Sequence, residues 1–245
     1  MNTLKSLLPT KQVKTKVAKE IGYVLFEGKS NIDGSNIVGI LTLKTTNVKT
    51  GQMAQLWILN ADMNPVETSK LGLDGGICGG CKLRQSLGGA CYVNIGQAPN
   101  SVYKAFKRNK YPILAIKDYS VLNGLKIRFG AYGDPYALPL EILSSLKAIA
   151  FNNTSYTHQW KIGSEVLKSV SMASVDSIEE QKEAVSNGWR TFRVANEDSI
   201  ILDNEIICPN VTKGINCVDC NLCNGSGSAK NIVIPIHGSW AKRFK

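Results

Sequence analysis

The sequence predicts an α/β fold in which an N-terminal region of antiparallel β structure leads into a partial (β/α) barrel-like parallel sheet. Strand-like runs separated by short turns fill the first part of the chain, which is typical of antiparallel hairpins. From residue 125 onward such runs alternate with helical ones, which predicts parallel strands joined by right-handed crossovers. The 245 residues, 43% of them hydrophobic, suffice for one large core. We therefore expect a single α/β domain over residues 21–245 behind a basic lead-in over residues 1–20.

Three strands are expected in the antiparallel region. Gly22–Phe26 and Ile37–Leu43 are strand-like runs, and the polar segment Ile32–Asn36 supplies the turn between them. Ala54–Leu59 is the third strand-like run. A glycine-rich loop with cysteines, Gly72–Cys91, comes next.

The rest of the chain alternates between helices and strands. Ala98–Asn109 has apolar residues at helical spacing, and Pro139–Asn152 carries an amphipathic stripe. Asn187-Gly188 ends the helical run Ile178–Ser186. The other expected elements are a helical turn at Glu165–Lys168 and strands at Leu125–Ala131, Ser155–Trp160, Ser169–Val175, Trp189–Val194 and Asn231–Ile236.

Polar residues follow four successive strands of the parallel region. They are found in Tyr132–Pro135, Tyr156–Trp160, Ser174–Asp176 and Arg193–Asn196. Because functional residues gather at the carboxyl ends of parallel strands, we expect these segments to share one face and to form the site.

The net charge of +10, from 29 Lys and Arg against 19 Asp and Glu, indicates an anionic partner such as nucleic acid or a nucleotide. A solvated basic face is the alternative. The composition excludes disordered, collagen-like and coiled-coil proteins. No stretch approaches the ~18 apolar residues of a membrane helix, and the first residues lack the apolar core of a signal peptide. We expect a cytoplasmic protein without membrane contact.

Cysteines form two groups, and they are the strongest chemical signal in the chain. Their odd number, seven, indicates reduced thiols rather than a disulfide framework. They lie among glycines and turn residues, as metal ligands do. The first group is Cys78, Cys81 and Cys91, and the second is Cys208, Cys217, Cys220 and Cys223.

The second group has the spacing of an iron–sulfur site. Cys217, Cys220 and Cys223 form a C-x2-C-x2-C run, and Cys208 supplies a more distant fourth thiol. Three closely spaced cysteines plus a distant one are typical of ferredoxin-like ligation of a 4Fe–4S cluster. Four thiolates also suit zinc, which is the alternative.

The first group has only three cysteines. Three thiolates on a cubic cluster leave one iron open for a small molecule, and three on zinc leave a water site. The alternative is that His158 or His237 completes an inert zinc site.

Seven cysteines split three plus four in an α/β chain resemble radical S-adenosylmethionine enzymes with an auxiliary cluster. The resemblance implies a full or partial (β/α) barrel, a cluster loop after its first strand, S-adenosylmethionine as cosubstrate and an external electron donor. Tyr132-Gly133-Asp134-Pro135 looks like the Gly-Gly-Glu-Pro element that holds the amino group of the cosubstrate in that family. The family spacing is C-x3-C-x2-C, whereas this chain has C-x2-C-x9-C.

A second resemblance covers most of the chain. Gln52–Leu59, Gly89–Asn94, Tyr156–Trp160 and Gly188–Val194 look like an uncharacterised cysteine-rich family carried by bacteriophages and plasmids. It implies a setting, the cytoplasm of a host cell, and says nothing about mechanism.

Several polar residues have both a functional and a structural interpretation. His158 is a candidate proton carrier or metal ligand, or a histidine satisfied by a backbone carbonyl. Asp134 is a candidate catalytic or cosubstrate-binding residue, or a turn aspartate before Pro135. Arg193 is a candidate bidentate partner for a carboxylate or phosphate. Asp176 is better explained as a helix N-cap.

Three functions follow from these observations. The first is a radical S-adenosylmethionine-type enzyme that modifies a nucleic acid or nucleotide, with Gly133, Asp134, Pro135 and Arg193 at its cosubstrate site. The second is a zinc-stabilised nucleic-acid-binding phage protein without catalytic activity. The third is a redox-inert accessory protein. P-loop, Rossmann, zincin, hydrolase-elbow and deaminase motifs are missing from the sequence, so those classes have no support.

Overall fold

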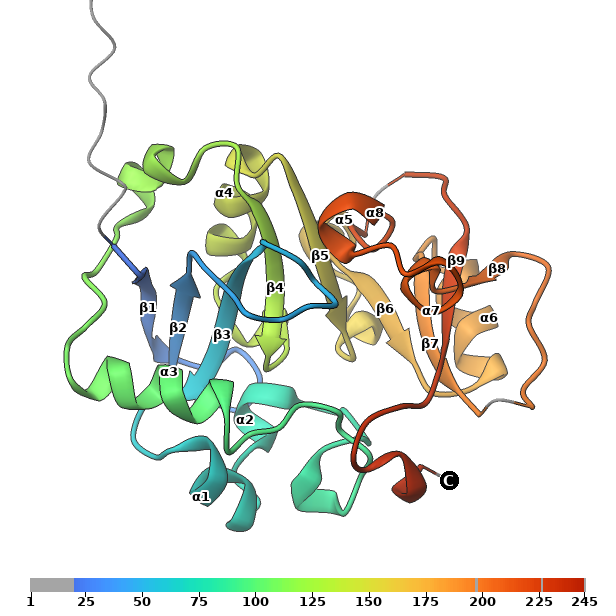
Figure 1. Cartoon of the computed structure of the whole chain (residues 1–245), viewed down its shortest axis with the longest axis horizontal. Coiled ribbons are helices and arrows are strands. Elements are labelled where there is room, and N and C mark those ends of the chain that lie inside the picture. The colour runs from blue at the N-terminus through green and yellow to red at the C-terminus, as the bar shows by residue number, and fades with distance from the viewer. Residues whose placement is uncertain (1–19, 197, 226, 245) are drawn as a thin grey trace, which may run out of the picture.

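A computed structural model describes residues 20–196, 198–225 and 227–244, and the predicted lead-in lies outside them except for its last residue. The fold is a mixed α/β sheet of nine strands in the order β1-β2-β3-β4-β5-β6-β7-β9-β8 (Figure 1). The antiparallel strands come first and the parallel strands follow, which confirms the predicted fold class. The two edges of the sheet do not pair with each other, so the partial barrel is open.

The antiparallel region consists of β1 (Gly22–Lys29), β2 (Asn36–Thr42) and β3 (Ala54–Asn60). β1 pairs with β2, and β2 pairs with β3, both antiparallel. β2 and β3 are almost continuously buried because both of their faces are covered. β3 pairs parallel with β4, so it joins the two parts of the sheet.

The long connection between β3 and β4 carries the first cysteine group. It contains α1 (Pro65–Lys70), α2 (Gly75–Cys78) and α3 (Ala98–Lys107). Asn64 begins α1, and its side chain accepts from two backbone N–H groups of the first turn. The cysteine loop therefore follows the first strand of the parallel region (Figure 1).

The parallel region continues by strand–helix alternation, as expected. The elements in order are β4 (Lys126–Tyr132), α4 (Leu140–Ile149), β5 (Asn152–Thr157), α5 (Glu165–Val170), β6 (Met172–Val175), α6 (Ile178–Ser186) and β7 (Thr191–Ala195). The helix α5 runs two residues further than expected because Leu167 and Val170 are both buried on its inner side. β6 is correspondingly shorter than the predicted strand.

The last segment adds its strands out of order. β8 (Glu205–Ile207) is the edge strand, and β9 (Asn231–Pro235) lies between β7 and β8, parallel to both. Between β8 and β9 lie α7 (Pro209–Lys213) and α8 (Cys217–Cys220) (Figure 1). This connection carries the second cysteine group: Cys208 precedes α7, Cys217 and Cys220 lie in α8, and Cys223 follows it. The predicted final strand is confirmed.

Most of the buried hydrophobic side chains form one core, whose residues come from the part of the chain between Tyr23 and Trp189. A smaller cluster under the last strands contains Met172, Cys208, Ile232 and Ile234. Within the described residues, no helix has the length and apolar character needed to span a lipid bilayer.

Candidate functional site

One face of the parallel strands lines two neighbouring cavities. Successive side chains of a strand point to opposite faces, so Ile127 and Phe129 of β4 are buried in the core while Arg128 and Tyr132 line the cavities. Tyr156 on β5 lines both of them. The site is thus built on rigid strands and closed by the two cysteine-bearing connections.

The first cavity, with a volume of about 130 Å³, is lined by Cys78, Cys81 and Cys91. We call these three residues the cysteine trio. Asp134 and His158, which follow β4 and β5, line the same cavity. The structure therefore brings the trio to the carboxyl ends of the parallel strands, together with both residues that the sequence analysis named as catalytic candidates.

Gly79 shapes the beginning of the trio loop. It directly follows α2 with a φ of 57°, and a β-carbon there would lie 2.1 Å from Nε2 of Gln159. That nitrogen is buried and has no hydrogen-bond partner among the described residues. The side chain of Gln159 therefore lies against the backbone between Cys78 and Cys81, a contact that only glycine permits.

Two adjacent glycines, Gly88 and Gly89, allow the chain to turn back so that Cys91 lies near the other two cysteines. The short helix η3 (Gln85–Leu87) ends at Gly88 with a φ of 73°. Gly89 packs so closely on Leu83 that a β-carbon would lie 2.5 Å from its carbonyl carbon. The N–H of Cys91 then donates to the carbonyl of Leu83 over 2.8 Å. This turn is how a C-x9-C spacing brings the third thiol to the same cavity.

Asp134 is a positioning residue at the end of β4. Its carboxylate accepts hydrogen bonds from Thr157 Oγ1 at 2.8 Å and from the backbone N–H groups of His158 at 2.8 Å and Tyr136 at 3.0 Å. Its own N–H donates to the carbonyl of Ile77 over 2.6 Å. Burial raises the pKa of Asp134, while the charge of His158 and these hydrogen bonds oppose the rise. The carboxylate fastens β4 to β5 and to the trio loop.

Gly133 and Pro135 flank this carboxylate. Gly133 has a φ of 87°, and a β-carbon there would lie 2.7 Å from Cβ of Ile58 and 3.2 Å from the carbonyl oxygen of Ile77. Pro135 is buried at the start of the helix η5 (Pro135–Ala137). The Tyr132–Pro135 segment is therefore packed directly against the loop that holds the trio.

His158 lies between the trio and an acidic residue. Its Nε2 is 3.6 Å from Oδ1 of Asp176. Burial lowers the pKa of His158, but the neighbouring Asp176 carboxylate and Cys81 thiol outweigh it and raise the pKa to about 10. His158 therefore lies beside two groups that favour its charged form, and its buried Nε2 has no hydrogen-bond partner among the described residues.

Asp176 differs from the expectation that it caps a helix. Ser177 is the N-cap of α6, and its hydroxyl accepts from the N–H of Glu180 at 3.1 Å. Because the cap is filled, the carboxylate of Asp176 faces His158 and Lys82 instead. Sequence reasoning missed this contact, since Asp and Ser before a helix are both good caps.

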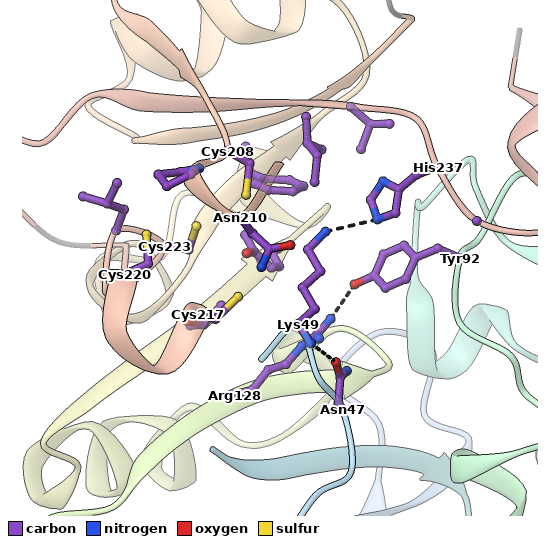
Figure 2. Close-up of a pocket in the computed structure, with 18 of the residues that line it drawn as sticks. Asn47, Lys49, Tyr92, Arg128, Cys208, Asn210, Cys217, Cys220, Cys223 and His237 are labelled. Atoms are coloured by element: carbon purple, nitrogen blue, oxygen red, sulfur yellow. Dashed lines mark hydrogen bonds between the residues drawn. The ribbon is translucent and has the colours of Figure 1, made fainter. Parts of the chain in front are cut away.

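The second cavity, with a volume of about 270 Å³, is lined by Cys208, Cys217, Cys220 and Cys223 (Figure 2). We call these residues the cysteine quartet. Backbone hydrogen bonds hold them to three parts of the fold. Cys208 donates to Val233 of β9 at 2.9 Å, Cys217 donates to Lys49 at 3.0 Å, and the carbonyl of Cys223 accepts from Ser155 of β5 at 2.8 Å.

Two cations line the quartet cavity, and the sequence analysis named neither of them. Lys49 Nζ lies 3.1 Å from Nε2 of His237, and the guanidinium of Arg128 donates to the hydroxyl of Tyr92 (Figure 2). Arg128 is 7% exposed, and its Nε is buried without a hydrogen-bond partner among the described residues. Within the described part of the chain, no carboxylate lies within 4.0 Å of either cation. An arginine inside a predicted buried strand was the available signal.

The two cavities are neighbours. They share a largely apolar wall, and no residue of the trio or of the quartet belongs to it. Its residues are Leu83, Tyr92, Tyr156, Phe192 and Val194. The two cysteine groups therefore belong to one site with two compartments.

The thiols of each group influence one another. Burial raises the pKa of Cys78 well above its usual range, with further contributions from Cys81 and Cys91. Burial likewise raises the pKa of Cys223 to about 12, and Cys217 adds to the rise. Within residues 20–196, 198–225 and 227–244, however, no three His, Cys, Asp or Glu side chains converge closely enough to hold a single metal ion.

Arg193 does not lie where the sequence analysis expected it. Strand alternation on β7 points it away from Phe192 and Val194, which line both cavities. Its Nε and a terminal nitrogen pair with the carboxylate of Glu205 at 2.8 and 2.6 Å, and the same nitrogen donates to the carbonyl of Ile200 at 2.8 Å. The expected bidentate pair exists, but with an internal carboxylate instead of a ligand.

Comparisons of the chain with family models, with curated proteins and with solved structures found no match.

Proposed function

We propose that this protein is an iron–sulfur enzyme of the radical S-adenosylmethionine type that modifies a nucleic acid or nucleotide in the cytoplasm of a host cell. The observation that carries the proposal is the position of the trio. Three thiols border a cavity at the carboxyl ends of the parallel strands, on the loop that follows the first of these strands. This is the place that the family resemblance implies for an open cluster.

The spacing of the thiols favours clusters over single ions. One zinc ion draws its thiolates to about 2.3 Å from the metal, so they almost touch one another. The thiols of each group line one cavity, and the quartet has the C-x2-C-x2-C spacing that is typical of cluster ligands. A cluster keeps its thiolates further apart because several iron and sulfide ions lie between them.

Charge supports an anionic centre at the quartet. Four thiolates around a cubic cluster carry more negative charge than its iron and sulfide core neutralises. Lys49 and Arg128 line the same cavity and have no carboxylate partner within the described residues. Burying such cations is costly unless an opposite charge lies near them.

Cys78, Cys81 and Cys91 would hold the catalytic cluster, and Gly133–Pro135 would shape the place of S-adenosylmethionine. When both groups are bound, the chemistry supplied is reductive cleavage of the cosubstrate, with an electron from an external donor. The chain's own part is to position them. Gly79 lets the loop pass under Gln159, and Asp134 ties the strand end to that loop. Since the carboxylate of Asp134 already accepts three hydrogen bonds, we assign it this positioning role.

One observation favours a second candidate function. His158 lines the same cavity as Cys78, Cys81 and Cys91, so a small movement of the loop would complete a Cys3His zinc site. The protein would then be a zinc-stabilised nucleic-acid-binding protein without catalytic activity.

Metal analysis of anaerobically purified protein separates the two functions. We expect a brown protein with iron and acid-labile sulfide, and variants Cys91→Ala and Cys217→Ala that each lose about half of the iron. We also expect 5′-deoxyadenosine after addition of S-adenosylmethionine and a strong reductant, in the wild type but not in Cys91→Ala. A colourless wild-type protein with stoichiometric zinc, which His158→Ala releases, would contradict the proposal and establish the second candidate.

A further inference from the structure

The rim of the quartet cavity combines exposed aromatic rings with cations. Tyr92 is 47% exposed and stacks on His237 with ring centroids 5.7 Å apart and planes 21° apart. Nζ of Lys49 lies 3.1 Å from Nε2 of the same His237 ring (Figure 2). Tyrosine and tryptophan rings are enriched at binding interfaces, because each has an apolar body and a polar end.

The C-terminal segment extends this rim. Gly238 packs on Tyr92, because a β-carbon there would lie 3.2 Å from Cβ of Tyr92. Two residues further, Trp240 is 37% exposed, and the guanidinium of Arg243 lies 3.8 Å from the centre of its ring. The segment therefore carries a second exposed ring and a second cation within five residues of the glycine that packs on Tyr92.

We propose that this rim binds single-stranded nucleic acid, with bases stacked on Tyr92 and Trp240 and phosphates held by Lys49 and Arg243. Stacking platforms interleaved with cations are the means by which proteins hold single strands, because every base has a π-face and every nucleotide one negative charge. The net charge of +10 attracts such a polyanion. A duplex hides the faces of its bases and reaches this rim only through its phosphates.

Single-stranded nucleic acid would be the substrate of the enzyme proposed above. Binding of the strand is argued from the rim itself, and only the purpose of that binding rests on the proposed function. A base that undergoes chemistry must leave its stack and enter a pocket. Tyr92 lines the trio cavity as well as the quartet cavity. A strand stacked on Tyr92 therefore lies beside the proposed place of the cosubstrate.

The test is fluorescence anisotropy with labelled single-stranded RNA and DNA of about 15 nucleotides, against the matching duplexes. We expect Tyr92→Leu and Trp240→Leu to weaken single-strand binding by about five-fold or more each, from the usual energy of base stacking. Lys49→Gln and Arg243→Gln should each reduce the slope of log K against log salt by about 0.7. The controls are Phe151→Leu, which removes an exposed ring elsewhere, and Lys110→Gln, which removes an exposed lysine; both should bind like the wild type.

Three outcomes overturn the proposal. The first is duplex binding as tight as single-strand binding, and the second is equal loss in the rim and control variants. The third is binding of a free nucleotide such as AMP, dependent on Tyr92, without binding of the strand. Iron and sulfide are measured on the same samples. Strand binding that follows the expected pattern in a protein without iron would retain the rim proposal and refute the enzyme, whereas iron with no strand binding would do the reverse.

Discussion

The backbone N–H of Asp134 donates a hydrogen bond of 2.6 Å to the carbonyl of Ile77, so the end of β4 is tied to the residue that precedes Cys78. The carboxylate of the same residue holds the end of β5 through Thr157 and His158. Two strand ends and the trio loop therefore share one fastening point. Sequence reasoning placed Asp134 at the site, and the structure gives it a positioning role there.

Removing this fastening should loosen the trio without affecting the quartet. We expect Asp134→Ala to lower the free energy of unfolding by about 2–4 kcal/mol, because several buried donors lose their acceptor. Asp134→Asn keeps one acceptor oxygen and should cost less. Urea unfolding measures the cost, and iron analysis should show a partial loss confined to the trio. Full iron content in Asp134→Ala would show that the trio does not depend on this residue.

Gly79→Ala tests the contact with Gln159. With φ 57° and ψ −132°, Gly79 lies outside the left-handed helical region that an alanine enters at a cost of about 1–2 kcal/mol, so its backbone conformation costs an alanine at least that much. The added β-carbon would also displace the side chain of Gln159. Gly72→Ala is the control for positive φ, because Gly72 has a φ of 73° and nothing within 4 Å of the added carbon. We expect Gly79→Ala to be the more destabilising in urea unfolding and to lose iron. The double variant Gly79→Ala with Gln159→Ala should recover part of the difference, and no recovery would place the cost elsewhere.

The buried ion pair of Arg193 and Glu205 should contribute to the stability of the fold and not to the binding of a ligand. The side chains of Arg193 and Glu205 are 3% and 0% exposed, so Arg193→Met alone leaves a buried carboxylate without its partner. We expect a loss of about 3–5 kcal/mol for the single variant and a smaller loss for Arg193→Met with Glu205→Leu. Thermal unfolding measures both, and iron content serves as the control. Loss of cosubstrate binding in a double variant of normal stability would restore Arg193 to the site.

His237 should titrate below its ordinary pKa of 6.5. Burial lowers the pKa, the nearby Lys49 ammonium lowers it further, and a hydrogen bond to the carbonyl of Pro235 opposes both. Since the unfolded chain binds this proton more readily, His237 lowers the stability of the fold as the pH falls through 6.5. We expect Lys49→Met to raise the pKa of His237 in an NMR titration, with His237→Asn identifying the signal. An unchanged or lower pKa would contradict the contact.

The alternation of elements was predictable, whereas the order of the last strands was not. Amphipathic stripes and turn residues locate elements such as α4 and α6 because these are local signals. The insertion of β9 between β7 and β8 depends on pairing between segments that the sequence does not place side by side. Local patterns do not carry that information.

The cysteine groups of the candidate site were visible in the sequence, but their surroundings were not. Spacing alone predicts that the thiols of each group lie near one another, and in the structure each group lines one cavity. Lys49 lies in an ordinary polar loop, and its place at the quartet depends on α8 docking on that loop. The direction of Arg193 follows from which face of β7 is covered, and this is a property of the whole sheet.

The position of β9 links the quartet to the pairing of the last two strands. The edge strand β8 pairs with β9 alone among the described strands, and all four quartet cysteines lie on the connection between the two. The connection between β8 and β9 must bring its two ends together before these strands can pair, and closing such a loop costs entropy. A metal centre bound by the four thiols would shorten the loop and so reduce this cost. Chelation should therefore speed amide hydrogen exchange in β8 and β9 first, leaving β2 and β3 protected.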